Sequence, residues 1–177
     1  MKIGIISDTH RKVKKTKKAL AHLLKNGAEF IIHAGDIVEV EILQMLKNSS
    51  LDYLAVYGNN DQHLMEHHDN FNLVQEPYYF NLAGLRFKLM HLPHYMTPDA
   101  DIIIFGHTHH FECEMNNGKL FLNSGEVCAR KKPISEFAML EILEDKFFVT
   151  HYEKGDGEVE FSSSEYQYLR EKKVIDE

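Results

Sequence analysis

The chain has 177 residues, which suits one domain with a sizeable core. Hydrophobic residues make up 44% of it, as in ordinary globular proteins, and its net charge of −7 argues against a general nucleic-acid-binding surface, because such binding neutralises phosphates. Two cysteines do not make a disulfide framework, and no run nears the roughly 18 apolar residues of a membrane span. We therefore expect a single cytoplasmic domain over 1–177, without a secretory signal or a membrane partner.

The first half of the sequence alternates short apolar runs with helical patterns. Three runs have the character of strands that are covered on both faces: 3–6, 30–32 and 54–57. Residues 12–25 and 38–47 carry apolar side chains at helical spacing, and Gly27 is a stop signal after the first of these helices. This order predicts parallel strands joined by right-handed crossovers.

The second half favours antiparallel strands. Residues 85–89 alternate apolar and polar, 102–105 form another apolar run, and a turn at 116–118 separates strands at 111–115 and 120–122. The remaining segments predict strands at 137–143 and 146–152, a loop with a short strand at 155–164, and a terminal helix over 165–173. The pattern predicts a two-sheet α/β domain, parallel early and antiparallel late.

Five short polar segments follow apolar runs: Asp8-Thr9-His10, Gly35-Asp36, Gly58-Asn59-Asn60-Asp61, His91, and Gly106-His107-Thr108-His109. Residues after parallel strands meet at one edge of a sheet, so these segments can converge. They offer carboxylate, imidazole and amide oxygen, which together suit a pair of divalent transition-metal ions. Singly, the first three segments are better explained as a turn, a loop or a helix cap, whereas Gly106-His107-Thr108-His109 favours a metal site and a bland explanation equally. Their combination in this order predicts a metal site.

The order of these segments resembles the calcineurin-like metallophosphoesterase superfamily, and within it the small bacterial and archaeal phosphodiesterases. The match runs from Asp8 to His109, and it implies a two-sheet β-sandwich flanked by helices, with mixed parallel and antiparallel strands. It also implies the metal ligands, with Asp36 shared between the two ions. The first ion would be held by Asp8, His10, Asp36 and His109, and the second by Asp36, Asn59, His91 and His107.

The resemblance implies a phosphodiesterase in which a hydroxide that bridges two divalent ions attacks the phosphorus of a small phosphate ester. Manganese is the expected metal, with nickel, zinc, iron and magnesium as alternatives. Two other functions stay open. One is a phosphomonoesterase or nucleotidase, and the other is a non-catalytic protein-interaction scaffold like the retromer subunit of this fold. A homo-oligomer is also open, because relatives often form dimers or larger assemblies.

Two positions depart from the family pattern. Asn60 stands where many relatives have a histidine that contacts phosphate and assists the leaving group, and an amide cannot act as a general acid near neutral pH. His94 is displaced by one residue, because His91-Leu92-Pro93-His94 replaces the usual His-Gly-His. We expect Asn60 or His94 to serve the leaving group, although an exposed loop histidine is an equal reading of His94.

Several further residues have two readings. His33 is expected to support the site or to pack, Asp61 to cap a helix or orient Asn60, and Glu126 to weaken anion binding if it points inward. His63, His67 and His68 are expected on a solvated helix, with a substrate-facing position as the alternative. The basic run Arg11–Lys18 holds six cations, which form either a solvated face or a collar that steers anions to the site.

Overall fold

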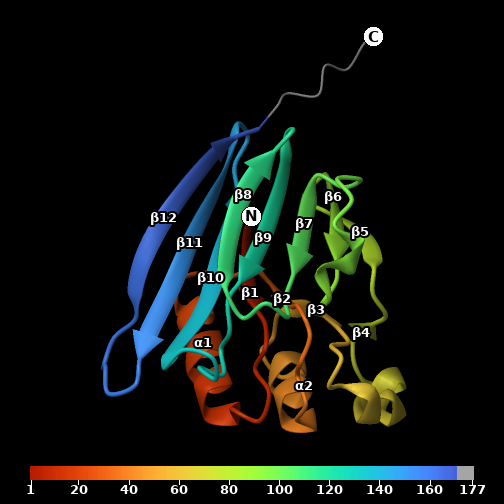
Figure 1. Cartoon of the computed structure of the whole chain (residues 1–177), viewed down its shortest axis with the longest axis vertical. Helices are drawn as coiled ribbons and strands as arrows, with labels where there is room; N and C mark the ends of the chain where they lie inside the picture. Colours follow the sequence, from red (N-terminus) through yellow and green to blue (C-terminus); the bar gives the residue numbers. More distant parts are fainter. Residues whose placement is uncertain (171–177) are drawn as a thin grey trace.

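Two β-sheets packed face to face, with two α-helices against the outer side of one sheet, form the structure, a computed structural model that describes residues 1–170 (Figure 1). The strands of the first sheet are β1 (Lys2–Ile6), β2 (Phe30–His33), β3 (Asp52–Val56), β4 (Leu73–Val74), β10 (Ile134–Ile142), β11 (Lys146–Gly155) and β12 (Ser162–Leu169). Their order is β12-β11-β10-β1-β2-β3-β4.

The second sheet contains five strands in the order β5-β6-β7-β9-β8. They are β5 (Tyr78–Leu82), β6 (Leu85–Leu89), β7 (Ile102–Phe105), β8 (Phe111–Asn116) and β9 (Lys119–Ser124). The helices are α1 (Val13–Lys25), α2 (Val40–Lys47) and the 3-10 segments η1 (Gln62–Asn70) and η2 (Pro93–Tyr95). Strands β1 to β4 are parallel, as are β6, β7 and β9, whereas β10, β11 and β12 pair antiparallel. The predicted two-sheet fold with mixed strand directions is confirmed.

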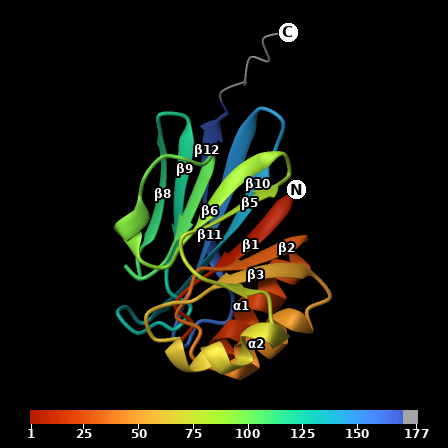
Figure 2. The same ribbon diagram turned by 90° about the vertical axis from the view of Figure 1, so that its right-hand side faces the viewer.

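Alternating side chains of β1 pack into two separate hydrophobic cores. Ile6 packs with the helices, while Ile3 and Ile5 pack between the two sheets. Figure 2 shows the consequence, with α1 and α2 beneath β1–β3 on the side away from β5 and β6. Gly4 lets α1 approach closely, because a Cβ there would lie 2.9 Å from Leu23 Cδ1. Each fully buried aliphatic side chain contributes roughly 1.5–3 kcal/mol to these cores.

Helix α1 follows the predicted pattern. Its buried side chains Thr16, Ala19, Leu20 and Leu23 recur at helical spacing on one face. The helix ends at Lys25 with Asn26 as its C-cap, and Gly27 follows in the left-handed region with φ of +85°. Within residues 1–170, none of the helices has the length and apolarity needed to cross a bilayer.

The predicted terminal helix over 165–173 is wrong. Residues 162–169 form strand β12, which pairs antiparallel with β11, for example Glu165 with Thr150. Tyr166 and Tyr168 alternate with exposed residues and pack against the core between the sheets. The alternation of half-buried and exposed side chains and the edge of β11 that β12 covers therefore outweigh helical propensity here. Residues 171–173 of the predicted helix lie outside the described part of the chain.

Candidate metal centre

All seven predicted metal ligands lie in loops that follow the carboxyl ends of strands from both sheets. Asp8 and His10 follow β1, Asp36 follows β2, Asn59 follows β3, His91 follows β6, and His107 and His109 follow β7. The loops meet at one rim, since β1–β3 run parallel in one sheet and β6–β7 run parallel in the other. Two sheets thus contribute to one cluster of polar side chains.

The backbone of these loops is strained. Five of the seven residues have positive φ: Asp8 (51°), His10 (44°), Asp36 (54°), His107 (68°) and His109 (64°). L-residues avoid this region, and such conformations persist only where the surrounding structure imposes them. Strain concentrated in this way marks the rim as a functional site.

Glycines precede three of these loops, for two different reasons. Gly35 has φ of +91°, a conformation of tight turns that glycine adopts without strain. Gly58 and Gly106 instead permit close approach. A Cβ at Gly58 would lie 2.2 Å from the Asp36 backbone nitrogen, and one at Gly106 would lie 2.3 Å from Ser7 Oγ. The loop after β3 therefore touches the loop after its neighbour β2 at Gly58, and the loop after β7 touches the loop after β1 of the other sheet at Gly106.

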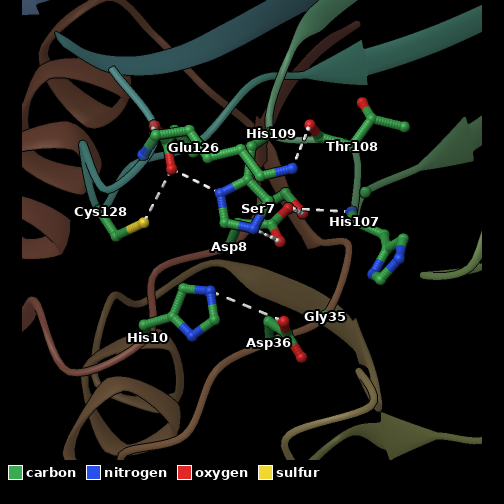
Figure 3. A network of polar contacts seen from close by, with 12 residues as sticks. Ser7, Asp8, His10, Gly35, Asp36, His107, Thr108, His109, Glu126 and Cys128 are labelled. Atoms are coloured by element: carbon green, nitrogen blue, oxygen red, sulfur yellow. Dashed lines mark hydrogen bonds and ion pairs between the residues drawn. The ribbon is translucent and has the colours of Figure 1, made fainter. Parts of the chain in front are cut away.

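The first donor set contains Asp8, His10, Asp36 and His109, whose donor atoms all lie within 4.8 Å of one another. His109 Nε2 is 3.3 Å from Asp8 Oδ1, and His10 Nε2 is 3.6 Å from Asp36 Oδ2 (Figure 3). The imidazoles of His10 and His109 stack with centroids 5.5 Å apart. Two carboxylates and two imidazoles thus converge on one point.

This donor set fits a cation, because two of its buried atoms have no hydrogen-bond partner. They are Asp8 Oδ1 and His10 Nε2. An unsatisfied buried polar atom costs about 1–3 kcal/mol. Burial also raises the pKa of Asp8, in spite of the opposing charges of His91 and His109. A divalent ion between these donors would satisfy both atoms and favour the ionised carboxylate.

The second donor set contains Asp36, Asn59, His91 and His107. Asn59 Oδ1 lies 3.1 Å from both His91 Nε2 and His107 Nδ1. His91 Nε2 is 3.5 Å from Asp36 Oδ1. Asp36 therefore turns one carboxylate oxygen toward each donor set, which is the arrangement that a bridging ligand needs.

Groups behind the donors orient two of the imidazoles. His91 Nδ1 donates to the carbonyl of Ala34 at 2.8 Å, so Nε2 faces Asp36 and Asn59. His109 Nδ1 donates to Glu126 Oε2 at 2.5 Å, so Nε2 faces Asp8. Such partners fix the ring and the tautomer of a metal-binding histidine.

The carboxylates and imidazoles of the centre shift one another's pKa values. Burial by itself would raise the pKa of Asp36, but hydrogen bonds from His91 and Asn60 outweigh it and hold that pKa well below its usual range. Burial would likewise lower the pKa of His91, yet Asp36 and Asp8 raise it to about 9. Burial lowers the pKa of His10 and of His107, which favours the neutral imidazole, the form that donates a lone pair to a metal.

Asn60 and Asp61 hold the centre together from behind. Asn60 donates to Asp36 from its backbone nitrogen (3.0 Å) and its side-chain amide (2.8 Å). Asp61 makes no side-chain cap on η1. It accepts instead from the backbone nitrogens of Ile37 (3.1 Å), Val38 (2.8 Å) and Gly58 (2.8 Å), so the capping interpretation is wrong. Asp61 therefore fixes the loops that carry Asp36 and Asn60.

His33 and His94 differ in burial and in their contacts. His33 is fully buried, lies 2.9 Å from Thr9 Oγ1 and accepts from the Gly35 nitrogen at 3.2 Å, as expected of a supporting residue. His94 is exposed on η2. The hollows next to the donors are lined by residues from other loops.

Two adjoining hollows open at the centre. The first, of about 450 Å³, lies over the donors and is also lined by Asn60, Arg130 and Lys131. The second, of about 580 Å³, is lined by Arg11, Lys12 and His63. His10, Asn60 and Arg130 line both. Of the basic run at 11–18, only Arg11 and Lys12 line this hollow, whereas Lys15 pairs with Asp156 at 2.7 Å.

Sequence reasoning singled out Glu126 in the loop after β9 but missed Arg130 and Lys131 of the same loop. Glu126 does point inward, but its carboxylate is engaged with His109, the Cys128 thiol and the backbone nitrogens of Lys131 and Lys132. Burial would raise the pKa of Glu126, and these hydrogen bonds hold it at about 2. The three successive cations at 130–132 were the signal that could have pointed to Arg130 and Lys131.

Comparison with known proteins identifies the family of this chain. The model of the calcineurin-like phosphoesterase superfamily domain matches residues 1–145. Phosphodiesterase MJ0936 of Methanocaldococcus jannaschii is 28% identical over 154 residues, covering 80% of this chain and 93% of that protein. The probable metallophosphoesterase MJ0623 of the same organism is 32% identical over 155 residues, covering 82% and 78%.

Solved structures give the same fold. A crystal structure of a Vps29 mutant from Entamoeba histolytica superposes with a TM-score of 0.73 at 23% identity, covering 94% of this chain and 99% of that chain. This likeness shows the fold, and the family match over residues 1–145 establishes that the chain belongs to the calcineurin-like phosphoesterase superfamily.

Proposed function

We propose that this protein is a phosphodiesterase that hydrolyses a small phosphate ester with the help of two divalent metal ions. The observation that carries the proposal is the position of Asp36, whose Oδ1 faces His91 at 3.5 Å and whose Oδ2 faces His10 at 3.6 Å. One carboxylate so placed can serve two ions at once, and the two donor sets supply three further ligands each. The mixed oxygen and nitrogen donors suit manganese, with nickel, zinc, iron and magnesium as alternatives.

The ions, when bound, would supply the nucleophile at neutral pH and stabilise the charge that develops on the phosphoryl group. The chain's own residues do the positioning. Glu126 and Ala34 orient His109 and His91, while Asn60 holds Asp36 through two hydrogen bonds. Arg130 and Lys131 line the hollow over the donors and would attract an anionic ester.

The side chain of Asn60 bears on the choice of ester. Its amide cannot donate a proton to a leaving alkoxide near neutral pH, which favours esters with good leaving groups. A phosphomonoesterase is the second candidate, because the two cations that line the hollow suit the double charge of a monoester. Both thiols, Cys113 and Cys128, are free, which supports the cytoplasmic location expected from the sequence.

Turnover of bis(p-nitrophenyl) phosphate and of p-nitrophenyl phosphate, each with added manganese, tests the proposal. We expect two bound ions per chain and a larger kcat/KM for the diester. Asp36→Asn should lower kcat/KM by about 10³-fold or more and should lose bound metal. Asp52→Asn, which removes an exposed carboxylate at the start of β3, is the matched control. A protein that binds two ions but hydrolyses neither ester would instead be a scaffold, and preference for the monoester would make it a phosphomonoesterase.

A further inference from the structure

The side-chain amide of Asn60 is directed toward Asp36 of the same chain. Its Nδ2 donates to Asp36 Oδ2 at 2.8 Å, and its backbone nitrogen donates to Asp36 Oδ1 at 3.0 Å. Both bonds aim the residue at the carboxylate below the hollow. Asn60 is therefore a positioning residue for Asp36, and it brings no positive charge to a phosphoryl group above the donors.

Arg130, unlike Asn60, brings a positive charge to the hollow over the donors. It lines both hollows, together with His10 and Asn60, and so stands between the space over the donors and the space beside it. Its neighbours in sequence are engaged elsewhere. Lys131 Nζ donates to the Thr108 carbonyl at 3.3 Å, and Lys132 Nζ pairs with Glu136 at 2.5 Å. Within residues 1–170, the Arg130 guanidinium has neither a hydrogen bond nor an ion pair with another side chain, so all its donors are open to a ligand.

The loop under Arg130 is held firmly. Glu126 is fully buried, and its Oε1 accepts from the backbone nitrogens of Lys131 (2.7 Å) and Lys132 (2.9 Å). Its Oε2 accepts from His109 Nδ1 at 2.5 Å. One carboxylate thus ties the backbone next to Arg130 to a donor of the first set. Ala129, with φ of +54°, makes the turn that presents Arg130.

We propose that Arg130 is a catalytic residue that binds the phosphoryl group of the substrate and stabilises the negative charge of the transition state. This role rests on the proposed function and deepens it. A guanidinium donates two parallel hydrogen bonds to phosphate oxygens, and it keeps its proton throughout, so it stabilises charge without acting as an acid. Arg130 therefore supplies the cationic contact that Asn60 does not supply. The expected substrates are phosphate esters whose leaving group can depart without accepting a proton from the loop that carries Arg130.

Binding of inorganic phosphate to the manganese-loaded protein tests this role apart from turnover. Isothermal titration should show affinity about 10- to 100-fold weaker in Arg130→Gln, the loss expected for charge-assisted hydrogen bonds. Arg130→Lys should recover only part of it, because an ammonium lacks the planar fork. Lys17→Gln is the matched control, since it removes an exposed cation on α1 and should bind phosphate within about twofold of the wild type.

Kinetics add a readout that a structural role would not move. Arg130→Ala should lower kcat/KM for bis(p-nitrophenyl) phosphate by about 10²- to 10³-fold, and added guanidinium ion should restore part of the loss. Metal content and melting temperature should match the wild type. Unchanged phosphate affinity in Arg130→Gln together with unchanged kcat/KM in Arg130→Ala would overturn the role. Loss of metal in both Arg130→Gln and Arg130→Lys would overturn it as well. If phosphate binding depends on Arg130 but the wild type hydrolyses no ester, the proposed function fails and the binding role stands.

Discussion

Glu126 Oε2 lies 2.5 Å from His109 Nδ1, and the same carboxylate holds the backbone of the loop that carries Arg130. Glu126 is fully buried, so this bond is protected from water. It turns Nε2 of His109 toward Asp8, 3.3 Å away (Figure 3). A single carboxylate therefore orients one donor of the centre and also positions its neighbouring cation.

Glu126→Gln should weaken metal binding by about 10- to 100-fold, because the imidazole loses the charged partner that fixes its tautomer and raises its basicity. Competition with a chelator would measure the manganese affinity. Glu41→Gln removes an exposed carboxylate of α2 and serves as the control. Equal affinities in the two variants would contradict a positioning role for Glu126.

Gly58→Ala should displace Asp36, since the new Cβ would lie 2.3 Å from Asp36 Oδ1 and 2.2 Å from its backbone nitrogen. Overpacking of this kind costs about 1–3 kcal/mol of unfolding free energy, and we expect bound metal to be lost as well. Gly84→Ala is the comparison, because a Cβ there meets nothing within 4 Å and the cost is confined to its φ of +73°. Denaturant titration and metal analysis measure both effects. Full metal content in Gly58→Ala would show that the Asp36 loop can shift without harm.

The stability of the metal-free protein should fall as the pH rises from about 6.5 to about 9. Burial opposes the charge on His91, yet Asp36 and Asp8 raise the pKa of this group from 6.5 to about 9 in the folded chain. Below pH 6.5 both folded and unfolded states hold the proton, so the stabilisation is complete there. Between the two values only the folded state holds it, and above about 9 the stabilisation is gone.

Urea unfolding in the presence of a chelator, measured across this pH window, tests the sign. His91→Gln should remove the slope. Metal binding should release the same proton, so the apparent manganese affinity should rise with pH up to about 9. A flat stability profile in the wild type would show that His91 is neutral in the metal-free chain.

Asn60→His should change the preference among leaving groups. A histidine can donate a proton to a departing alkoxide, an effect worth about 10²- to 10⁴-fold in other enzymes. We expect turnover of an alkyl ester to rise at least about tenfold relative to an aryl ester. The variant also loses the amide bond to Asp36, so the ratio of the two rates, rather than either rate alone, is the measurement. Asn60→Ala, which loses the same bond without gaining an acid, is the control, and equal ratios in the two variants would refute the assignment.

Local patterns in the chain accounted for most of the elements. The parallel strands β1 to β3 and β7 are short apolar runs, and α1 carries its buried stripe at helical spacing. The turn between β8 and β9 was equally visible, since Asn117 and Gly118 both take the positive φ that such residues tolerate. These features depend on neighbours in sequence, so a single sequence reveals them.

Elements that depend on distant partners were missed or misread. Strand β12 was read as a helix because the edge of β11 that it covers cannot be seen locally. Asp61 was read as a cap, although its partners include Ile37 and Val38, which lie more than 20 positions away in sequence. Long-range pairing decided both, and it outweighs local propensity wherever a sheet edge or a buried carboxylate is at stake.

The sequence alone determined the order and chemistry of the donor residues, because each donor sits directly after a strand whose own pattern is local. Only the tertiary structure decided that Glu126 orients a donor and that Arg130 reaches the centre. Arg130 and Glu126 come from a loop far along the chain from Asp8, and they reach the rim because β9 pairs with β7 and its carboxyl end meets the ends of the other parallel strands. Strand order, not sequence spacing, brings these groups together.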